Sequence, residues 1–99
     1  MSVYMIVYLE SITDATELAE YRRIGVPTLA TSKAKFLVRN GRFEMLEGPA
    51  PQSVLMLEFP TMADAKEWYE SPQYQEALQH RYAGATCRAL FVEGLEDVE

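Results

Sequence analysis

A chain of 99 residues with 48% apolar and 24% charged residues has the length and composition of one soluble globular domain. Fifteen acidic residues against nine basic ones give a net charge of −6, which opposes binding to phosphate backbones, so we expect no nucleic-acid partner. No segment approaches the roughly 20 apolar residues of a membrane span, and the first residues lack the pattern of a leader peptide. We therefore expect no membrane insertion and a cytoplasmic location.

One cysteine, Cys87, and one histidine, His80, are too few to build a thiolate or imidazole metal site, and a lone cysteine cannot form a disulfide within the chain. Neither of the glycine-rich phosphate-binding motifs, G-x-G-x-x-G and G-x-x-x-x-G-K-S/T, occurs. We therefore expect no metal ion and no cofactor.

The first predicted strand runs from Val3 to Leu9 and is apolar at nearly every position, which is typical of a strand buried on both faces. Asp14, followed three residues later by Glu17, has the pattern of a capping box and predicts the start of a helix. Apolar residues then recur at helical spacing at Ala15, Leu18, Ala19 and Val26. Pro27 lacks an amide hydrogen, so we expect the helix to kink or restart there and to end near Thr31.

The dipeptide Asn40-Gly41 is the turn signal of the next segment. It is flanked by the strand-like runs Phe36 to Arg39 and Arg42 to Met45. Asn-Gly tolerates the positive φ angles of a type I′ turn better than other pairs. We therefore predict a tight hairpin with positive φ at Gly41, followed by a loop at Gly48 to Pro51.

A further strand is predicted from Ser53 to Phe59, where the run Val54 to Leu57 shows no alternation of apolar and polar residues. Thr61, three residues before Asp64, predicts the N-cap of a second helix. That helix carries Ala65, Trp68 and Tyr69.

Ser71-Pro72 supplies the N-cap and first position of a third helix. One face of this helix carries Tyr74, Ala77, Leu78, Arg81, Tyr82 and Ala85. The last predicted strand runs from Arg88 to Glu93, and residues 96–99 form an acidic tail.

The order of these elements is that of a ferredoxin-like β-α-β-β-α-β fold in which the second strand is elaborated into a hairpin. We therefore predict one α+β domain over residues 1–95, with helices covering one face of an antiparallel sheet. Because the strands from Val3 to Leu9 and from Val54 to Leu57 are apolar on both faces, we expect a second copy to bury the other sheet face, giving a homodimer.

Arg81 is the most informative charged residue because it lies on the apolar face of its helix. An unpaired buried charge costs several kcal/mol, so its guanidinium needs a partner. Glu58 and Arg39 are similar cases, since each shares a strand face with apolar residues. Three arrangements remain open: Arg81 extends outward into solvent, forms a salt bridge with Glu58 or Glu47, or lines an anion-accepting pocket.

The candidate ligand-binding residues are Arg39, Glu58, Trp68, Ser71, Tyr74 and Arg81. Tyr21 and Tyr69 could line the same pocket. Trp68 and Tyr74 are also compatible with a core position, whereas Ser71 is expected to be a helix cap first and Cys87 a small core residue. No Ser-His-acid or Cys-His arrangement can be argued, since His80 is offset from the Arg81 face and is expected to face solvent. The catalytic residues therefore stay unknown.

A set of residues spread along the chain carries a family likeness. It comprises Tyr21-Arg22, Phe36-Leu37-Val38-Arg39 with Gly41, Leu46-Glu47-Gly48, Glu58-Phe59-Pro60, Ala65, Trp68-Tyr69-Glu70-Ser71, Tyr74, Arg81 and Val92-Glu93-Gly94. From Tyr4 to about Gly94 the chain resembles the DUF1330 family, and this resemblance implies a small dimeric α+β barrel domain. It departs at Ser32-Lys33-Ala34, where the family usually has an aromatic residue and two glycines. The wider superfamily includes cofactor-free monooxygenases and haem-binding proteins, a distant likeness that implies a fold and not a reaction.

Two functions are compatible with these features. The first is a site between the helices and the sheet, catalytic or merely binding, for a small polar or anionic metabolite. A carboxylate near an arginine and a tyrosine there could position a substrate and move a proton. The second is a noncatalytic dimeric module whose polar cluster only stabilises the fold. A pocket that holds an adventitious ligand, with Arg81 unpaired to any protein carboxylate, would favour the first, and a closed bridge between Arg81 and Glu58 with no cavity would favour the second.

Overall fold

The computed structural model describes residues 2–95 and confirms an α+β fold. Its elements are β1 (Val3–Ile12), α1 (Ala15–Thr28), the 3₁₀ helix η1 (Leu29–Thr31), β2 (Lys35–Arg39), β3 (Ser53–Phe59), α2 (Met62–Tyr69), α3 (Pro72–Gly84) and β4 (Ala85–Glu93). β1 and β4 are each three residues longer than predicted, since β1 continues to Ile12 and β4 begins at Ala85. The acidic tail predicted for residues 96–99 lies outside the described residues.

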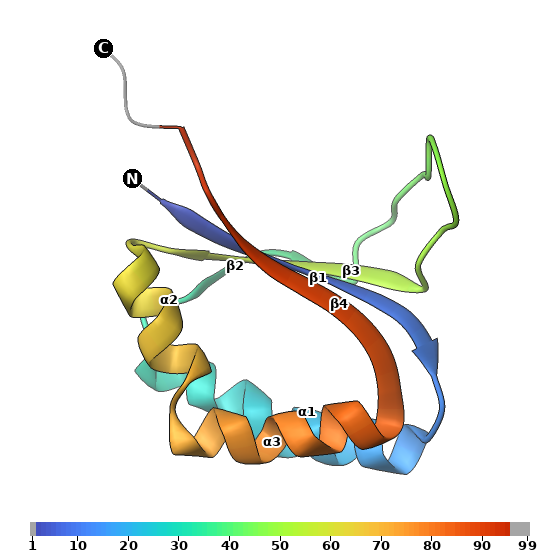
Figure 1. Ribbon diagram of the computed structural model, residues 1–99, viewed down its shortest axis with the longest axis horizontal. Helices are drawn as coiled ribbons and strands as arrows, with labels where there is room; N and C mark the ends of the chain where they lie inside the picture. The colour runs from blue at the N-terminus through green and yellow to red at the C-terminus, as the bar shows by residue number, and fades with distance from the viewer. Residues whose placement is uncertain (1, 96–99) are drawn as a thin grey trace.

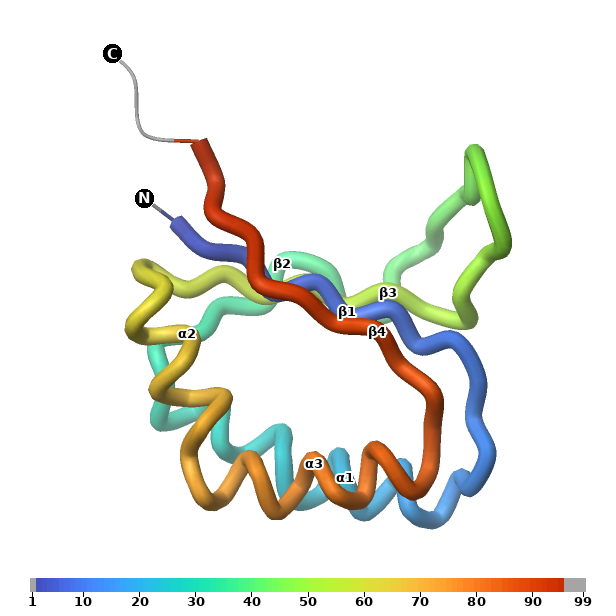
Figure 2. Tube along the Cα trace, in the orientation of Figure 1, coloured from blue at the N-terminus to red at the C-terminus, as the bar shows by residue number. Residues whose placement is uncertain are grey.

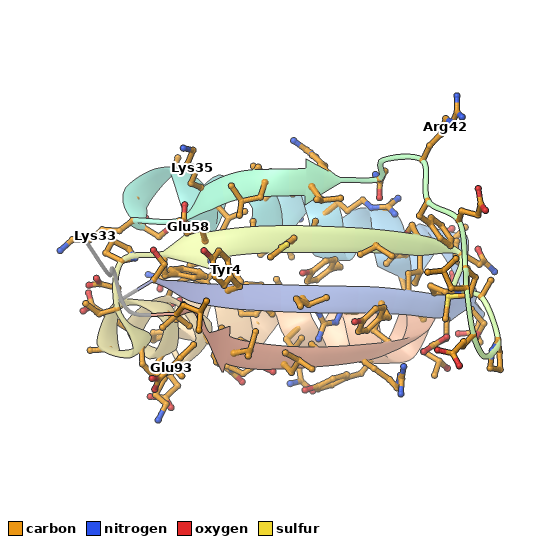
Figure 3. All side chains as sticks on the ribbon, turned by 90° about the horizontal axis from the view of Figure 1, so that it is seen from above. Tyr4, Lys33, Lys35, Arg42, Glu58 and Glu93 are labelled. Carbon is orange, nitrogen blue, oxygen red and sulfur yellow. The ribbon has the colours of Figure 1, made fainter. Side chains whose placement is uncertain are left out.

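The four strands form one antiparallel sheet in the order β2-β3-β1-β4, as the ferredoxin-like plan requires. In register, Met5 of β1 lies opposite Leu57 of β3 on one side and Phe91 of β4 on the other. All three α-helices cover the same face of this sheet (Figures 1 and 2). Seen through the sheet, α1 runs behind β2 and β3, and α3 runs behind β1 and β4 (Figure 3). The helix-covered side is called the inner face below. None of the described helices is long and apolar enough to cross a membrane.

The hydrophobic core lies where α2 and α3 meet the inner face. The sheet contributes Val3, Met5, Leu57 and Phe59, and the helices contribute Ala65, Trp68, Tyr74 and Leu78. The rings of Trp68 and Tyr74 are tilted against each other with centroids 4.1 Å apart. This aromatic contact fixes α2 against α3.

Three side chains predicted to cap helices do so. The Asp14 carboxylate accepts from the Thr16 and Glu17 amides, Thr61 Oγ1 accepts from the Asp64 amide at 3.1 Å, and Ser71 Oγ accepts from the Tyr74 amide at 3.3 Å. Each cap satisfies amide hydrogens that the first helical turn leaves without a partner.

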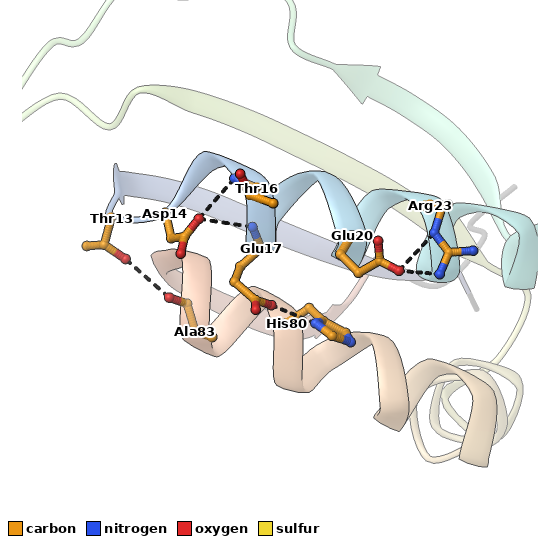
Figure 4. A network of polar contacts seen from close by, with 8 residues as sticks. All are labelled: Thr13, Asp14, Thr16, Glu17, Glu20, Arg23, His80 and Ala83. Carbon is orange, nitrogen blue, oxygen red and sulfur yellow. Dashed lines mark hydrogen bonds and ion pairs between the residues drawn. The ribbon is translucent and has the colours of Figure 1, made fainter.

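Glu17, however, does not complete a capping box. Its carboxylate lies 2.6 Å from His80 Nδ1 (Figure 4), and the Asp14 amide donates instead to the carbonyl of Gly84 at 3.0 Å. His80 is therefore half-buried in a link between α1 and α3, where the sequence predicted a solvent-facing side chain. The contact across the two helices replaces the local one because α3 ends beside the start of α1.

The hairpin predicted at Asn40-Gly41 is wrong. β2 ends at Arg39, residues 42–45 are not a strand, and Asn40 rather than Gly41 has positive φ, at 56°. The Asn40 amide donates to the Val54 carbonyl at 3.2 Å, so β2 pairs with β3 through a long connection. The connection rises from the sheet on the side away from the helices (Figure 1). A type I′ turn needs positive φ at both central residues, and only Asn40 has it, so the chain does not turn back to pair with β2.

Two helical faces also differ from the predicted ones. Ala15 and Ala19 of α1 are exposed, and the buried residues of that helix are Leu18 and Gly25. Tyr82 of α3 is 61% exposed, while the other predicted face residues of α3 and the following Ala85 are buried. As predicted, the helical segment that contains Pro27 ends at Thr31, its last turn being 3₁₀.

The sheet side opposite the helices is called the open face. Ile6 of β1 points to it and lies opposite Met56 of β3 and Leu90 of β4. Val54 and Val92, two residues from Met56 and Leu90 on the same strands, point to the same face. Leu90 and Val92 are 46% and 43% exposed. Within residues 2–95 no helix covers this apolar surface (Figure 3).

Candidate functional site

A cavity of about 290 Å³ lies between α1 and the inner face of the sheet. The strands contribute Met5, Val7, Leu9, Leu55 and Leu57 to its walls. The helical side contributes Leu18, Val26 and Leu29. Ordinary small-molecule sites measure about 300–1,000 Å³ and have mainly apolar walls, so the cavity has the size and surface of a small one.

The charged side chains of the cavity are all basic. Arg22, Arg39 and Arg81 line it, and none of its described lining residues is an aspartate or a glutamate. The excess is notable in a chain whose net charge is −6. Three guanidiniums without a carboxylate raise the local potential and favour an anion.

Arg81 lies at the buried end of the cavity and is 6% exposed. Its Nη1 donates to the Tyr74 hydroxyl at 3.4 Å, and its guanidinium carbon lies 5.5 Å from the centre of the Tyr21 ring. Its Nε is buried without a hydrogen-bond partner, and no carboxylate among residues 2–95 pairs with it. Of the three arrangements that the sequence left open, those in which Arg81 reaches solvent or bridges to Glu58 or Glu47 are thus wrong.

Two tyrosine hydroxyls meet next to this guanidinium. Tyr21 of α1 and Tyr74 of α3 are hydrogen-bonded at 2.8 Å, and Tyr21 also lines the cavity. Burial raises the pKa of Tyr74 well above its usual range, and neighbouring Tyr21 adds to this while Arg81 opposes it. Tyr74 is therefore a neutral phenol at physiological pH.

Trp68 closes the cavity from α2 and is also part of the core. Its indole Nε1 donates to Thr28 Oγ1 at 2.9 Å, and Thr28 Oγ1 in turn donates to the Gly25 carbonyl. The bond anchors α2 to the end of α1. Because a buried indole N–H needs an acceptor, Thr28 determines the orientation of this wall.

Arg22 and Arg39 are the exposed arginines of the cavity. They come from α1 and β2, and the Arg39 guanidinium stacks 4.7 Å from the centre of the Phe36 ring. The cavity therefore opens near the β2 edge between two solvated cations, and Arg81 lies at its inner end.

Two of the six candidate residues lie apart from the cavity. Glu58 is on the open face, opposite Tyr4 and Lys35, because Leu57 and Phe59 on either side of it face the core (Figure 3). Ser71 is held by its cap and by a bond from its hydroxyl to the Trp68 carbonyl at 2.7 Å.

The other four candidates are brought together. Arg39, Trp68 and Arg81 line the cavity, and Tyr74 reaches it through its bonds to Tyr21 and Arg81. Tyr69 does not line it and packs against Phe91 instead.

Arg22 and Cys87 are lining residues that the list of candidates lacked. Arg22 could have been found from its position one turn after Leu18 on the same side of α1. Burial raises the pKa of the Cys87 thiol, and the nearby Arg81 opposes the shift. The shift favours the neutral thiol over the thiolate, which is the nucleophilic form. Among the described residues, no cluster of three His, Cys, Asp or Glu side chains could hold a metal ion.

The element order and the four-stranded antiparallel sheet with its helices on one side are those of a ferredoxin-like α+β domain. Within this class, the sequence model of DUF1330, a domain of unknown function, matches residues 2–95. The chain belongs to the DUF1330 family. No curated protein matches it.

Several solved structures are similar to the chain. A protein of unknown function from Rhodopseudomonas palustris is 26% identical with a TM-score of 0.77, and the match covers 97% of this chain and 84% of that one. A dimeric ferredoxin-like protein of unknown function from Bacteroides fragilis is 16% identical with a TM-score of 0.64, covering 94% and 96%. SnoaB, a cofactor-independent oxygenase from Streptomyces nogalater, is 7% identical with a TM-score of 0.61, covering 98% and 95%. The last two likenesses extend to the fold alone.

Proposed function

We propose that the protein binds a small anionic metabolite in the cavity between α1 and the sheet, with Arg81 as the anchor. The observation that carries this proposal is the burial of Arg81 without a carboxylate partner among the described residues. Leaving a buried charge unpaired costs several kcal/mol. A negatively charged ligand at Arg81 would recover this energy on binding.

Binding is better supported than turnover. The carboxylate expected to move a proton, Glu58, lies on the open face, and no acidic side chain lines the cavity within the described residues. Tyr74 and Cys87 are held neutral by burial, so neither is a ready base or nucleophile. When Tyr74 donates in its hydrogen bond with Tyr21, the Tyr21 hydroxyl is left as a hydrogen-bond donor to a bound anion.

A thermal-shift screen of small carboxylic acids and inorganic phosphate tests the proposal. We expect at least one of these anions to raise the melting temperature of the wild type as its concentration increases, and to have no such effect on Arg81→Met. Arg23→Met is the matched control, because Arg23 is exposed on α1 and bonded to Glu20. If no anion stabilises the wild type, or if all stabilise Arg81→Met equally, the proposal is wrong.

We further propose that two copies associate through their open faces, an arrangement that also suits the second candidate function, a noncatalytic dimeric module. Support comes from the apolar side chains of this face and from Phe43, Met45 and Leu46, which are exposed on the connection that rises on the same side (Figure 1). The dimeric protein from Bacteroides fragilis has a similar fold. The cytoplasmic location expected from the sequence stays a prediction.

A further inference from the structure

We infer that the ligand is a monocarboxylic acid with a compact apolar body, its carboxylate bound by Arg81 and Tyr21 and its body lying along the aliphatic walls of the cavity. This inference rests on the proposed function and specifies the class of ligand. It follows from the direction of the hydrogen bonds, from the charge at the inner end and from the walls.

The polar groups at the inner end form a chain of donors. Arg81 can only donate, so the Tyr74 oxygen accepts from its Nη1. The hydroxyls of Tyr74 and Tyr21 lie 2.8 Å apart and either can donate; when Tyr74 donates, the Tyr21 hydrogen is left for the cavity that Tyr21 lines. With the guanidinium of Arg81, which lines the cavity, the inner end therefore offers N–H and O–H donors. A group that only accepts hydrogen bonds, such as a carboxylate, fits this end best.

The charge at the inner end limits the ligand to a single negative charge there. Arg81 is the one buried cation of the described lining residues, since Arg22 and Arg39 are exposed. A phosphate group carries about −1.5 to −2 charges at pH 7, so one guanidinium would leave part of that charge buried and uncompensated. A carboxylate carries one charge and balances Arg81. The two exposed arginines would instead attract anions to the opening.

The walls of the cavity limit the chemistry of the rest of the ligand. Most of the wall is made of aliphatic side chains of β1, β3 and α1 together with Trp68 and Phe36, and it also includes two uncharged polar side chains, Asn40 and Ser53. Polar groups such as hydroxyls would lose their hydrogen bonds to water against the aliphatic part of the wall. At roughly 30 Å³ for each water-sized group, the volume holds about ten such groups. A short aliphatic chain carrying one ring fits these limits.

Titration of the fluorescence of Trp68 gives a direct test, because Trp68 is the only tryptophan and lines the cavity. The probes are 4-phenylbutyrate, its neutral analogue 4-phenylbutanamide, and inorganic phosphate. We expect saturable binding of 4-phenylbutyrate, with both the amide and phosphate at least about tenfold weaker, the penalty of one mismatched buried charge or hydrogen bond. Arg81→Met should lower the affinity for 4-phenylbutyrate to that for the amide, and Arg39→Met should lower the affinity for 4-phenylbutyrate less than threefold.

Each other outcome contradicts the inference in a distinct way. If Arg81→Met weakens the binding of phosphate, and 4-phenylbutyrate does not bind, the proposed anion site is supported but the inferred class of ligand, a monocarboxylic acid, is wrong. Equal binding of the acid and the amide would mean that the charge is not recognised. A larger loss in Arg39→Met than in Arg81→Met would place the carboxylate at the opening. If Arg81→Met weakens the binding of neither 4-phenylbutyrate nor phosphate, the inference is wrong, and so is the proposed function for carboxylates and phosphates.

Discussion

The hydroxyl of Tyr21 on α1 lies 2.8 Å from the hydroxyl of Tyr74 on α3, and the pair joins the two helices beside the guanidinium of Arg81. Tyr74 is 1% exposed, and this burial disfavours the charged phenolate form of its side chain. Folding therefore keeps Tyr74 protonated to a higher pH than in the unfolded chain, where its pKa is about 10.

This shift predicts a loss of stability in alkali. A phenol whose pKa is raised by folding stabilises the folded protein fully below pH 10, and this contribution is lost as the pH rises further. We expect the free energy of unfolding, measured with urea at pH 8, 10 and 11, to fall more steeply above pH 10 in the wild type than in Tyr74→Phe. Tyr82→Phe is the exposed control and should follow the wild type. Parallel curves for the wild type and Tyr74→Phe would refute the assignment.

Gly84 predicts a large effect of a single methyl group. A Cβ at this position would lie 2.6 Å from the backbone nitrogen of Leu18 and 2.7 Å from the backbone oxygen of Asp14. Backbone atoms cannot move without shifting α1, so we expect Gly84→Ala to lower the free energy of unfolding by about 2–3 kcal/mol. The measurement is urea denaturation at one protein concentration.

Gly41→Ala is the control for that prediction. Its Cβ would meet only the Val38 side chain, at 3.7 Å, and Gly41 lacks the positive φ predicted from the sequence. We expect a change within about 0.5 kcal/mol. A loss at Gly41 as large as that at Gly84 would contradict the corrected turn, and a change at Gly84 as small as that expected at Gly41 would contradict the packing at the end of α3.

The open face predicts that a charge at Met56 disrupts the proposed dimer. Met56 lies opposite Ile6 on this face, whereas neighbouring Leu55 lines the cavity on the other side. A buried carboxylate without a partner is costly, so we expect light scattering at micromolar concentration to show a monomer for Met56→Asp and a dimer for the wild type. Gln79→Asp, on the exposed side of α3, should leave the dimer intact. A monomeric wild type would be evidence against association through the open face.

Much of the fold could be predicted because its signals are local. Asp14, Thr61 and Ser71 cap their helices through amides two or three residues away, so a short stretch of sequence decides each helix start. The turn at Asn40 could not be predicted in the same way, since the local preference of Asn-Gly does not determine that β2 pairs with β3. The same holds for Glu17, whose partner His80 lies 63 positions further along the chain.

The candidate site was predictable where helical spacing decided it. The position of Arg81 on the buried face of α3 follows from Tyr74, Ala77 and Leu78. Glu58 was misplaced because Val54 to Leu57 is apolar throughout, which hides the alternation that assigns a strand residue to one face. The basic lining of the cavity depends on α1, β2 and α3 coming together, and no single segment of the sequence contains it.

Urea denaturation of the wild type and Arg81→Met, both without ligand and at the same protein concentration, tests the central claim that Arg81 serves a ligand rather than a structural salt bridge. Because no carboxylate of the described chain pairs with Arg81, the methionine removes a desolvated charge, and we predict that the free energy of unfolding is unchanged or increased. Arg23→Met controls for the loss of a surface arginine. A decrease of about 3–5 kcal/mol in Arg81→Met, the cost of breaking a buried ion pair, would contradict the account.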